Sequence, residues 1–233
     1  MLARLPLWLW LWLWPTLLAA TAHANDRPLQ IARTAVMEDD EQVWSFESWA
    51  EKRGNVRGLT VEPEYTFSDG YSLQFQLSRF ADKVGEQTGH EAEVEFKKIF
   101  NHIGRDGYGL ALSASLGTER SRESGTSRSL SLKLPISVAL LEGGPTLHLN
   151  PGLSKTSASR RAWTSAIAIE HGVYKRTTAF AELAHEGPLR FAQIGARHWL
   201  RKDRLAIDIA WQRQRGSDGR ATGLILGLGW YDL

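Results

Sequence analysis

Apolar and polar residues alternate with a period of two along most of this chain, and this alternation constrains the fold more than any other feature. In residues 59–67, apolar side chains take every odd position while Thr and Glu take the even ones. After the turn sequence Ser-Asp-Gly at 68–70, the alternation resumes over residues 71–78. A period of two is that of a β-strand with one apolar and one polar face. The segment therefore predicts a β-hairpin.

The polar residues of this hairpin are expected to face one another. If the turn is centred on Asp69, Glu64 lies opposite Gln74 and Glu62 lies opposite Gln76. Because cross-strand neighbours on one face of a sheet interact directly, this register gathers the polar side chains on a single side.

The same alternation recurs often enough to predict about twelve antiparallel strands. Further segments carry it, the last six less regularly: 108–116, 129–138, 147–154, 205–212, 43–52, 91–100, 162–171, 178–185, 189–200 and 222–233. Most are close to the ~9–11 residues that a tilted strand needs to cross a bilayer. Since no segment of helical length shows a helical period, the chain is predicted to be all-β.

Two folds share this pattern, a soluble barrel or sandwich with its apolar face inward and a transmembrane barrel with its apolar face toward lipid. The charges of the polar face favour the second, because burying them in a soluble core would be very costly. We therefore predict an antiparallel up-and-down transmembrane β-barrel. Its lumen is expected to be lined by Glu47, Glu62, Glu64, Glu95, Lys97, Lys133, Glu170, Glu182, Arg197 and Asp208.

Turn lengths and aromatic positions agree with this prediction. If the chain starts on the periplasmic side, the turns on that side are short, whereas 81–90, 117–128 and 213–221 are long outer loops. This asymmetry is typical of outer-membrane barrels. An interfacial girdle of aromatic residues is expected near the periplasmic strand ends: Trp44, Phe67, Tyr71, Phe100, Tyr108, Tyr174, Trp199 and Tyr231.

The first residues predict a secretory signal peptide. Arg4 precedes an apolar stretch over 5–18, which Pro15 interrupts, and small residues follow as far as Ala24. The stretch is shorter than the ~20 apolar residues of a spanning helix, and the order of its parts is that of an export signal. We expect residues 1–24 to be cleaved, residues 25–41 to form a periplasmic N-terminal segment and residues 42–233 to form the barrel.

Composition and spacing exclude several other functions. Lys and Arg total 28 against 26 Asp and Glu, and a formal charge of +2 argues against nucleic acid as a partner. The chain has no cysteine, which excludes disulfides and thiol chemistry. The histidines after the signal are scattered, without a ligand spacing such as H-x-x-x-H. We therefore predict neither a metal nor a cofactor.

A few segments carry a likeness to known proteins. They are Trp49, LTVEPEY at 59–65, GYGLAL at 107–112 and the final strand. In these the chain resembles small Gram-negative outer-membrane β-barrel proteins, including transporter-like barrels of the MetA-pathway phenol-degradation type. The resemblance implies residence in the cell outer membrane and insertion by the outer-membrane barrel assembly machinery, which reads a terminal aromatic residue.

The end of the chain fits this resemblance only in part. Tyr231 matches the third-from-last position, but Leu233 replaces the usual Phe. If Tyr231 faces outward, simple alternation turns Leu224, Leu226, Leu228 and Trp230 inward unless a bulge intervenes.

The expected lumen leads to a first hypothesis of function. Its acidic residues outnumber the basic ones, and a barrel of about twelve strands is wider than the eight-strand case that side chains fill. We predict a narrow pore, or a passive transporter or binder of an unidentified small solute, with a preference for cations. The sequence leaves open a closed structural barrel without conductance, because Arg197 and the lysines could tie the carboxylates together.

Two further hypotheses concern outer-membrane lipid. Basic residues of the outer loops are expected to contact lipopolysaccharide phosphates, through Arg120, Arg122, Arg160, Arg161, Arg213 and Arg215. A lipid-modifying hydrolase is the alternative, and it needs a serine, a histidine and an orienting polar group in contact. Ser137, His148 and Asn150 are its candidates if Ser137 lies opposite Asn150. Because His148 is near a proposed periplasmic turn, away from outer-leaflet lipid, we do not predict an enzyme.

Overall fold

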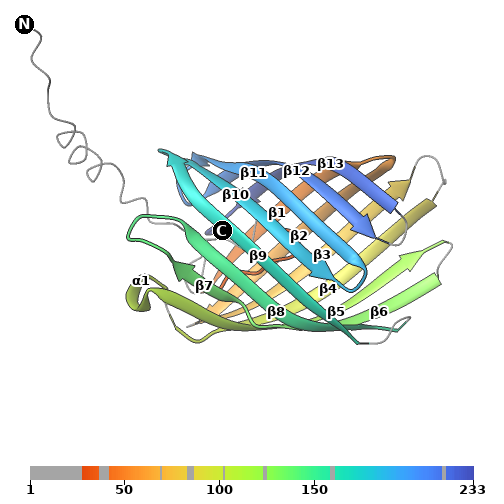
Figure 1. The fold of residues 1–233 in the computed structure, drawn as a ribbon, viewed down its shortest axis with the longest axis horizontal. Helices are drawn as coiled ribbons and strands as arrows, with labels where there is room; N and C mark the ends of the chain where they lie inside the picture. The colour runs from red at the N-terminus through yellow and green to blue at the C-terminus, as the bar shows by residue number, and fades with distance from the viewer. Residues whose placement is uncertain are drawn as a thin grey trace, which may run out of the picture.

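The computed structural model describes residues 28–36, 42–68, 70–82, 87–101, 103–122, 125–157, 161–216 and 219–233. In this part of the chain, one antiparallel sheet closes into a barrel (Figure 1). Its strands are β1 (Val43–Arg53), β2 (Val56–Ser68), β3 (Tyr71–Asp82), β4 (Gln87–Ile99), β5 (Tyr108–Ser121), β6 (Gly125–Lys133), β7 (Ile136–Ala139), β8 (Thr146–Thr156), β9 (Ala162–Tyr174), β10 (Thr177–Glu186), β11 (Leu189–Arg201), β12 (Leu205–Gly216) and β13 (Gly219–Trp230). One short helix, α1 (Ile103–Asp106), precedes β5. The predicted all-β fold is confirmed.

The barrel closes because its first and last strands pair. β1 pairs with β13, and β4 pairs with β5. β6 and β7 share one position in the wall, since each of them pairs with both β5 and β8. Pro135, which has no N–H to donate to a ladder, lies between them. The thirteen segments thus fill twelve positions, which confirms the predicted number of strands.

The barrel turns its apolar face outward and its polar face inward. Leu59, Leu116 and Trp163 are 56%, 59% and 73% exposed, whereas Glu62 and Gln212 are 4% and 1% exposed. A soluble barrel would place the first group in its core. The predicted arrangement, with apolar side chains toward lipid and polar side chains toward the lumen, is confirmed.

The two rims of the barrel are named here by the chain ends. The terminal rim is where β1 begins and β13 ends, and the distal rim carries the turn between β1 and β2. The first predicted hairpin turns at the terminal rim, where Glu64 pairs with Gln74 as expected. The register is the same on both sides of Pro63, with Val61 opposite Leu77, so Glu62 keeps its expected place opposite Gln76.

The distal loops are shorter than the sequence analysis predicted. Strands continue into all three expected loops, 81–90, 117–128 and 213–221. The alternation weakens there because charged and small polar residues replace aliphatic ones at the outward positions. The predicted asymmetry between short turns and long outer loops is therefore smaller than expected.

An outward Tyr231 would require the leucines and Trp230 of β13 to face the lumen, but β13 has the opposite orientation. Leu226 and Trp230 are 60% and 53% exposed, whereas Tyr231 is 2% exposed and turns into the lumen. Trp199 also lies against Tyr231, with ring centroids 5.4 Å apart. The other predicted girdle residues are exposed: Trp44, Phe67, Tyr71, Phe100, Tyr108 and Tyr174. The prediction of Tyr231 in the girdle was wrong, because simple alternation holds through the end of β13.

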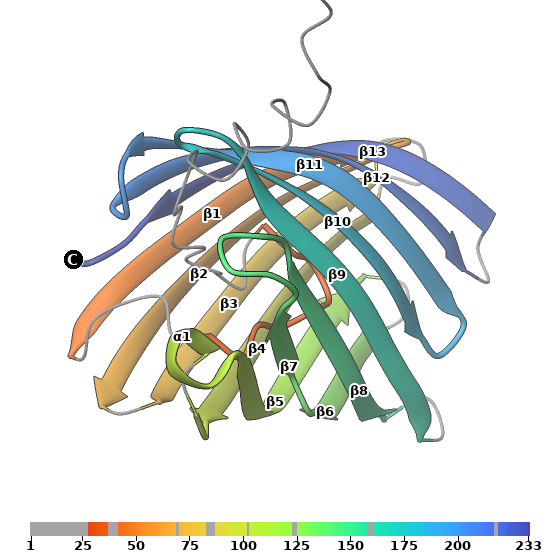
Figure 2. The ribbon, with the colours of Figure 1, turned by 60° about the vertical axis from the view of Figure 1, so that its left-hand side comes forward.

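The first described stretch, residues 28–36, lies inside the barrel (Figure 2). We refer to it as the luminal segment. Residues 25–41 were expected to form a periplasmic segment, but the described part of this range contacts the inner wall. The predicted signal peptide, residues 1–24, lies outside the described residues. No helix within the described residues is long and apolar enough to cross a membrane.

Candidate functional site

The luminal segment is held by a carboxylate from β10. The backbone N–H groups of Gln30 and Ile31 donate to the Glu182 carboxylate at 2.8 and 2.9 Å, and the N–H of Ala32 also donates to it. Gln193 on β11 donates to the same carboxylate at 2.7 Å and to the carbonyl of Pro28 at 3.0 Å. Because hydrogen bonds to a charged acceptor are stronger than neutral ones, Glu182 is a principal anchor of the segment.

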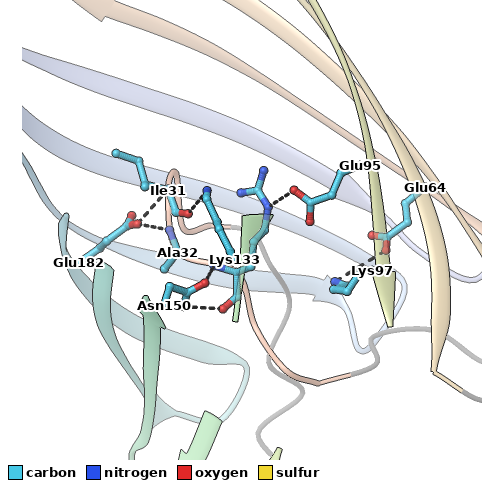
Figure 3. Close-up of polar contacts among 9 residues, drawn as sticks. Ile31, Ala32, Glu64, Glu95, Lys97, Lys133, Asn150 and Glu182 are labelled. Atoms are coloured by element: carbon cyan, nitrogen blue, oxygen red, sulfur yellow. Dashed lines mark hydrogen bonds and ion pairs between the residues drawn. The ribbon is translucent and has the colours of Figure 1, made fainter. Parts of the chain in front are cut away.

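A second group of contacts fixes the next residues of the segment. Asn150 on β8 pairs with both backbone groups of Arg33, accepting from its N–H at 2.8 Å and donating to its carbonyl at 2.9 Å. The ammonium group of Lys133 donates to the carbonyl of Ile31 at 2.9 Å (Figure 3). The N–H of Ala35 donates to Ser137 at 2.8 Å. The inner wall thus satisfies much of the segment's backbone, as a buried backbone requires.

Apolar packing adds to these hydrogen bonds. Leu29 is fully buried among inward-facing side chains that include Trp49, Phe180, Phe191 and Ile225. These residues form an apolar patch on an otherwise polar inner wall. Burying a leucine side chain contributes about 1.5–3 kcal/mol, so Leu29 is a second anchor of the segment.

Gly109 on β5 lets the segment approach the wall closely. A Cβ at this position would overlap the carbonyl oxygen of Ala35. Gly109 is at an inward position, opposite Ser137 in the ladder. The absence of a side chain is therefore required for the segment to lie where it does.

Ion pairs lie along the inner wall beside the segment. The guanidinium of Arg33 donates to Glu95 on β4 at 2.9 Å, and both side chains are buried. Lys97, also on β4, lies 3.8 Å from Glu64 on β2 (Figure 3). Buried charges are tolerated when they are paired, and these pairs neutralise two of the predicted luminal carboxylates.

A further cluster lies near the terminal rim. Arg197 donates to Asp208 at 2.7 and 2.9 Å and to Glu47 at 3.3 Å. The hydroxyl of Tyr231 donates to the same Glu47. The guanidinium also lies 5.7 and 5.6 Å from the ring centroids of Trp199 and Tyr231, within reach of cation–π attraction.

All ten predicted lumen residues lie at inward positions, but they form separate contacts rather than rings of carboxylates. Glu47, Glu62, Glu95, Lys97, Glu170, Glu182 and Arg197 are buried, and Glu64, Lys133 and Asp208 are half-buried. Their partners include Arg33 and the backbone of the luminal segment, which the sequence analysis placed in the periplasm. The interior is thus cross-paired, the arrangement that the sequence left open.

An acidic vestibule opens between the luminal segment and the distal rim. It is a cavity of about 270 Å³ whose acidic lining residues are Glu91, Glu93, Glu119 and Glu186 and whose basic ones are Arg33, Arg128 and Lys133. These glutamates were not among the predicted lumen residues, because Glu119 and Glu186 fall in expected connections between strands and Glu91 and Glu93 in a strand with irregular alternation. Inward parity, counted from Glu95 back along β4, is the signal that could have found Glu91 and Glu93.

The serine and histidine candidates meet at a buried position of the inner wall. Ser137 lies opposite His148 rather than Asn150, two residues from the expected register, and its hydroxyl is 2.8 Å from His148 Nδ1. His148 Nε2 lies 3.3 Å from Glu170 without hydrogen-bond geometry. Ser137 and His148 are both 0% exposed, and the Ser137 hydroxyl binds the luminal segment. Ser137 therefore helps to hold the segment, and His148 contacts the Ser137 hydroxyl.

The arginines expected to contact lipopolysaccharide do not form one group. Arg120 lies on β5, and Arg213 and Arg215 lie together on β12. Arg122 and Arg161 are exposed outside the strands, and Arg160 lies outside the described residues. Among the described residues, no group of three or more His, Asp or Glu side chains is placed to hold a metal ion.

Comparison with solved structures finds barrels of similar fold. The KdgM porin in complex with disordered oligogalacturonate has a TM-score of 0.62 at 12% identity, over 80% of this chain and 98% of that chain. The NanC porin has a TM-score of 0.59 at 7% identity, over 81% of this chain and 100% of that chain. LpxR from Salmonella typhimurium has a TM-score of 0.52 at 7% identity, over 80% of this chain and 99% of that chain.

The closed wall, the apolar exterior and the polar lumen define this protein as a transmembrane β-barrel. The solved structures show that its fold is that of outer-membrane β-barrel proteins, porins among them. The sequence matches no family model, and no curated protein matches it. The narrower resemblance to barrels of the MetA-pathway phenol-degradation type is not confirmed.

Proposed function

We propose that this barrel lies in a Gram-negative outer membrane and admits a small cationic solute through its distal rim, with the luminal segment as the barrier to free passage. The observation that carries this proposal is the acidic vestibule directly above that segment. The fold shared with the KdgM and NanC porins supports a role in solute passage.

The charges of the vestibule favour cations. Glu91 lies opposite Glu119 in the ladder between β4 and β5, and Glu93 follows on the same inner face. Two basic residues of the vestibule, Arg33 and Lys133, are already bound by other groups of the protein. Carboxylates gathered at the mouth of a pore attract cations and repel anions.

The luminal segment sets the expected size of the current. Its contacts with Glu182, Asn150 and Ser137 occupy the lumen below the vestibule. A hydrogen bond contributes about 0.5–1.5 kcal/mol, and about 1.5–3 kcal/mol when one partner is charged, so several together keep the segment in place for most of the time. We expect low conductance with infrequent openings.

Planar-bilayer recording under a KCl gradient tests the proposed selectivity. The reversal potential of the wild-type openings should show cation preference, and the triple variant Glu91→Gln/Glu93→Gln/Glu119→Gln should lose most of it. The control variant Asp106→Asn/Glu142→Gln/Asp203→Asn removes three acids outside the strands and should behave as the wild type. Anion preference, or unchanged selectivity in the vestibule variant, would contradict the proposal.

The KdgM porin provides a contrasting expectation, because its structure holds an oligogalacturonate, which is an anion. If this barrel took such a ligand, block of the current by oligogalacturonate should be seen in the wild type. We expect no block, since the carboxylates of the vestibule repel the ligand.

A further inference from the structure

Charge is segregated between the two faces of the wall near the distal rim. Every Asp and Glu of the described strands lies at an inward position. The outward positions near that rim carry exposed basic residues instead: Lys52, Arg57, Arg79, Arg120, Lys155, Arg190, Arg213, Arg215 and Arg220. A barrel in contact with neutral lipid has no physical need for such a row of cations at this level.

Four of these arginines form one cluster across β11, β12 and β13. Arg215 lies directly opposite Arg190 on one side and Arg220 on the other. Arg213 lies two residues before Arg215 and therefore on the same face. None of the four forms an ion pair or hydrogen bond with another residue in the described part of the chain. Like charges this close repel one another, which leaves the cluster in need of an external anion.

An apolar groove continues from this arginine cluster along the outside of the wall. It has a volume of about 870 Å³ and runs over β8 to β13, past outward residues that include Leu149, Pro151, Ile167, Leu183 and Ala192. The four arginines line the same groove. Its volume is within the range of about 300–1,000 Å³ that is usual for ligand sites. One occupant must therefore combine a strong anion with an apolar part.

We propose that this groove binds a phosphorylated acyl lipid of the outer leaflet, lipopolysaccharide, with its phosphates on Arg190, Arg213, Arg215 and Arg220 and an acyl chain along the apolar part. The guanidinium fork suits a phosphate through paired, charge-assisted hydrogen bonds. The position of the arginines at the distal end of otherwise aliphatic strands is the level at which a lipid headgroup meets its acyl chains. The site is independent of solute passage through the lumen.

Two of the arginines predicted from the sequence to contact lipopolysaccharide belong to this site. Arg213 and Arg215 were expected to contact lipopolysaccharide phosphates, and Arg190 and Arg220 complete their cluster. Arg120 lies on the other side of the barrel, in a row with His90 on β4. It belongs to a smaller groove and is not part of this site.

Native mass spectrometry of the full chain in detergent tests the arginine cluster. The probes are bisphosphorylated hexa-acyl lipid A, the same lipid without its phosphates, and inorganic pyrophosphate. The variant Arg190→Gln/Arg213→Gln/Arg215→Gln/Arg220→Gln should bind bisphosphorylated lipid A at least about tenfold more weakly than the wild type, since two or more charge-assisted bonds are lost. The matched control Lys175→Gln/Arg176→Gln/Arg201→Gln/Lys202→Gln removes as many cations from the terminal rim and should bind normally.

A second variant tests the groove without changing any charge. Ala192→Trp places a large side chain into the groove on its lipid-facing side, where folding of the barrel does not depend on it. It should weaken lipid A binding several-fold while leaving the circular dichroism spectrum unchanged.

Three results would overturn the proposal. They are equal binding of lipid A to the wild type and the four-arginine variant, equal binding of lipid A with and without phosphates, and displacement of lipid A by equimolar pyrophosphate. Displacement by pyrophosphate would mean that the arginines bind free phosphate groups and that no lipid occupies the groove. Loss of lipid binding leaves the cation preference of the lumen unchanged, so the two proposals fail separately.

Discussion

At the scale of single residues, the inner wall uses a few inward side chains to hold a stretch of backbone. Glu182 accepts from three consecutive N–H groups, and Asn150 matches both backbone groups of Arg33. A carboxylate is suited to this role because it only accepts, and can accept several hydrogen bonds at once. The charge of Glu182 therefore serves to bind the luminal segment and is not available to a solute.

Replacement of this carboxylate should release the start of the segment. In Glu182→Gln the acceptor is neutral and offers one oxygen instead of two, so hydrogen exchange at Gln30, Ile31 and Ala32 should accelerate by about 10-fold or more. The control Glu186→Gln changes the same face of the same strand at a residue that forms no hydrogen bond with residues 28–36. Exchange measured by mass spectrometry should be normal in the control, and equal exchange in both variants would refute the role of Glu182.

Gly109 permits a similar test at the other end of the segment. In Gly109→Ala the new Cβ overlaps the Ala35 carbonyl, so residues 34–36 must move and the bond from Ala35 to Ser137 is lost. Exchange at Ala35 should increase markedly. Gly104→Ala, where a Cβ meets open space, should leave it unchanged. Protection of Ala35 in the first variant would show that the segment does not approach the wall here.

At the scale of elements, the sequence predicts the strands well and the luminal segment not at all. Alternation alone is sufficient for the strands, because each outward side chain meets lipid and each inward one meets the lumen. The luminal segment has no period, and its partners lie far away in the sequence, Glu182 more than 100 residues from Ile31. The same limit applies to the site, since inward glutamates could be identified but their partners could not.

The apolar patch inside the barrel gives the segment a second measurable anchor. The chain has no cysteine, so Ala32→Cys introduces a single thiol at a fully buried position. Adding Leu29→Ala should cost at least about 2 kcal/mol of segment binding and accelerate labelling by a water-soluble maleimide about thirtyfold. Adding Leu226→Ala, on the lipid-facing side of β13, should not accelerate it. Equal labelling rates in the two double variants would contradict the anchor.

At the scale of the whole molecule, three kinds of side chain occupy three places. Aliphatic residues face lipid, the acidic residues of the described strands face the lumen, and many basic residues take outward positions near the distal rim. In the proposed outer-membrane location, we expect this separation to orient the barrel, because a leaflet rich in phosphate attracts a basic distal rim. It also places most cations of the distal rim on the outer face, so that we expect this rim to favour anionic lipid outside the wall and cationic solutes inside it.

The central claim is that a closed barrel with an acidic vestibule is kept shut by residues 28–36. Its most direct test is single-channel recording of the wild type beside the double variant Leu29→Ala/Glu182→Gln, which loses both anchors. The claim predicts brief, rare openings in the wild type and long-lived, cation-selective openings in the variant. A wild-type barrel that already conducts as steadily as the variant, or a variant that stays silent, would contradict it.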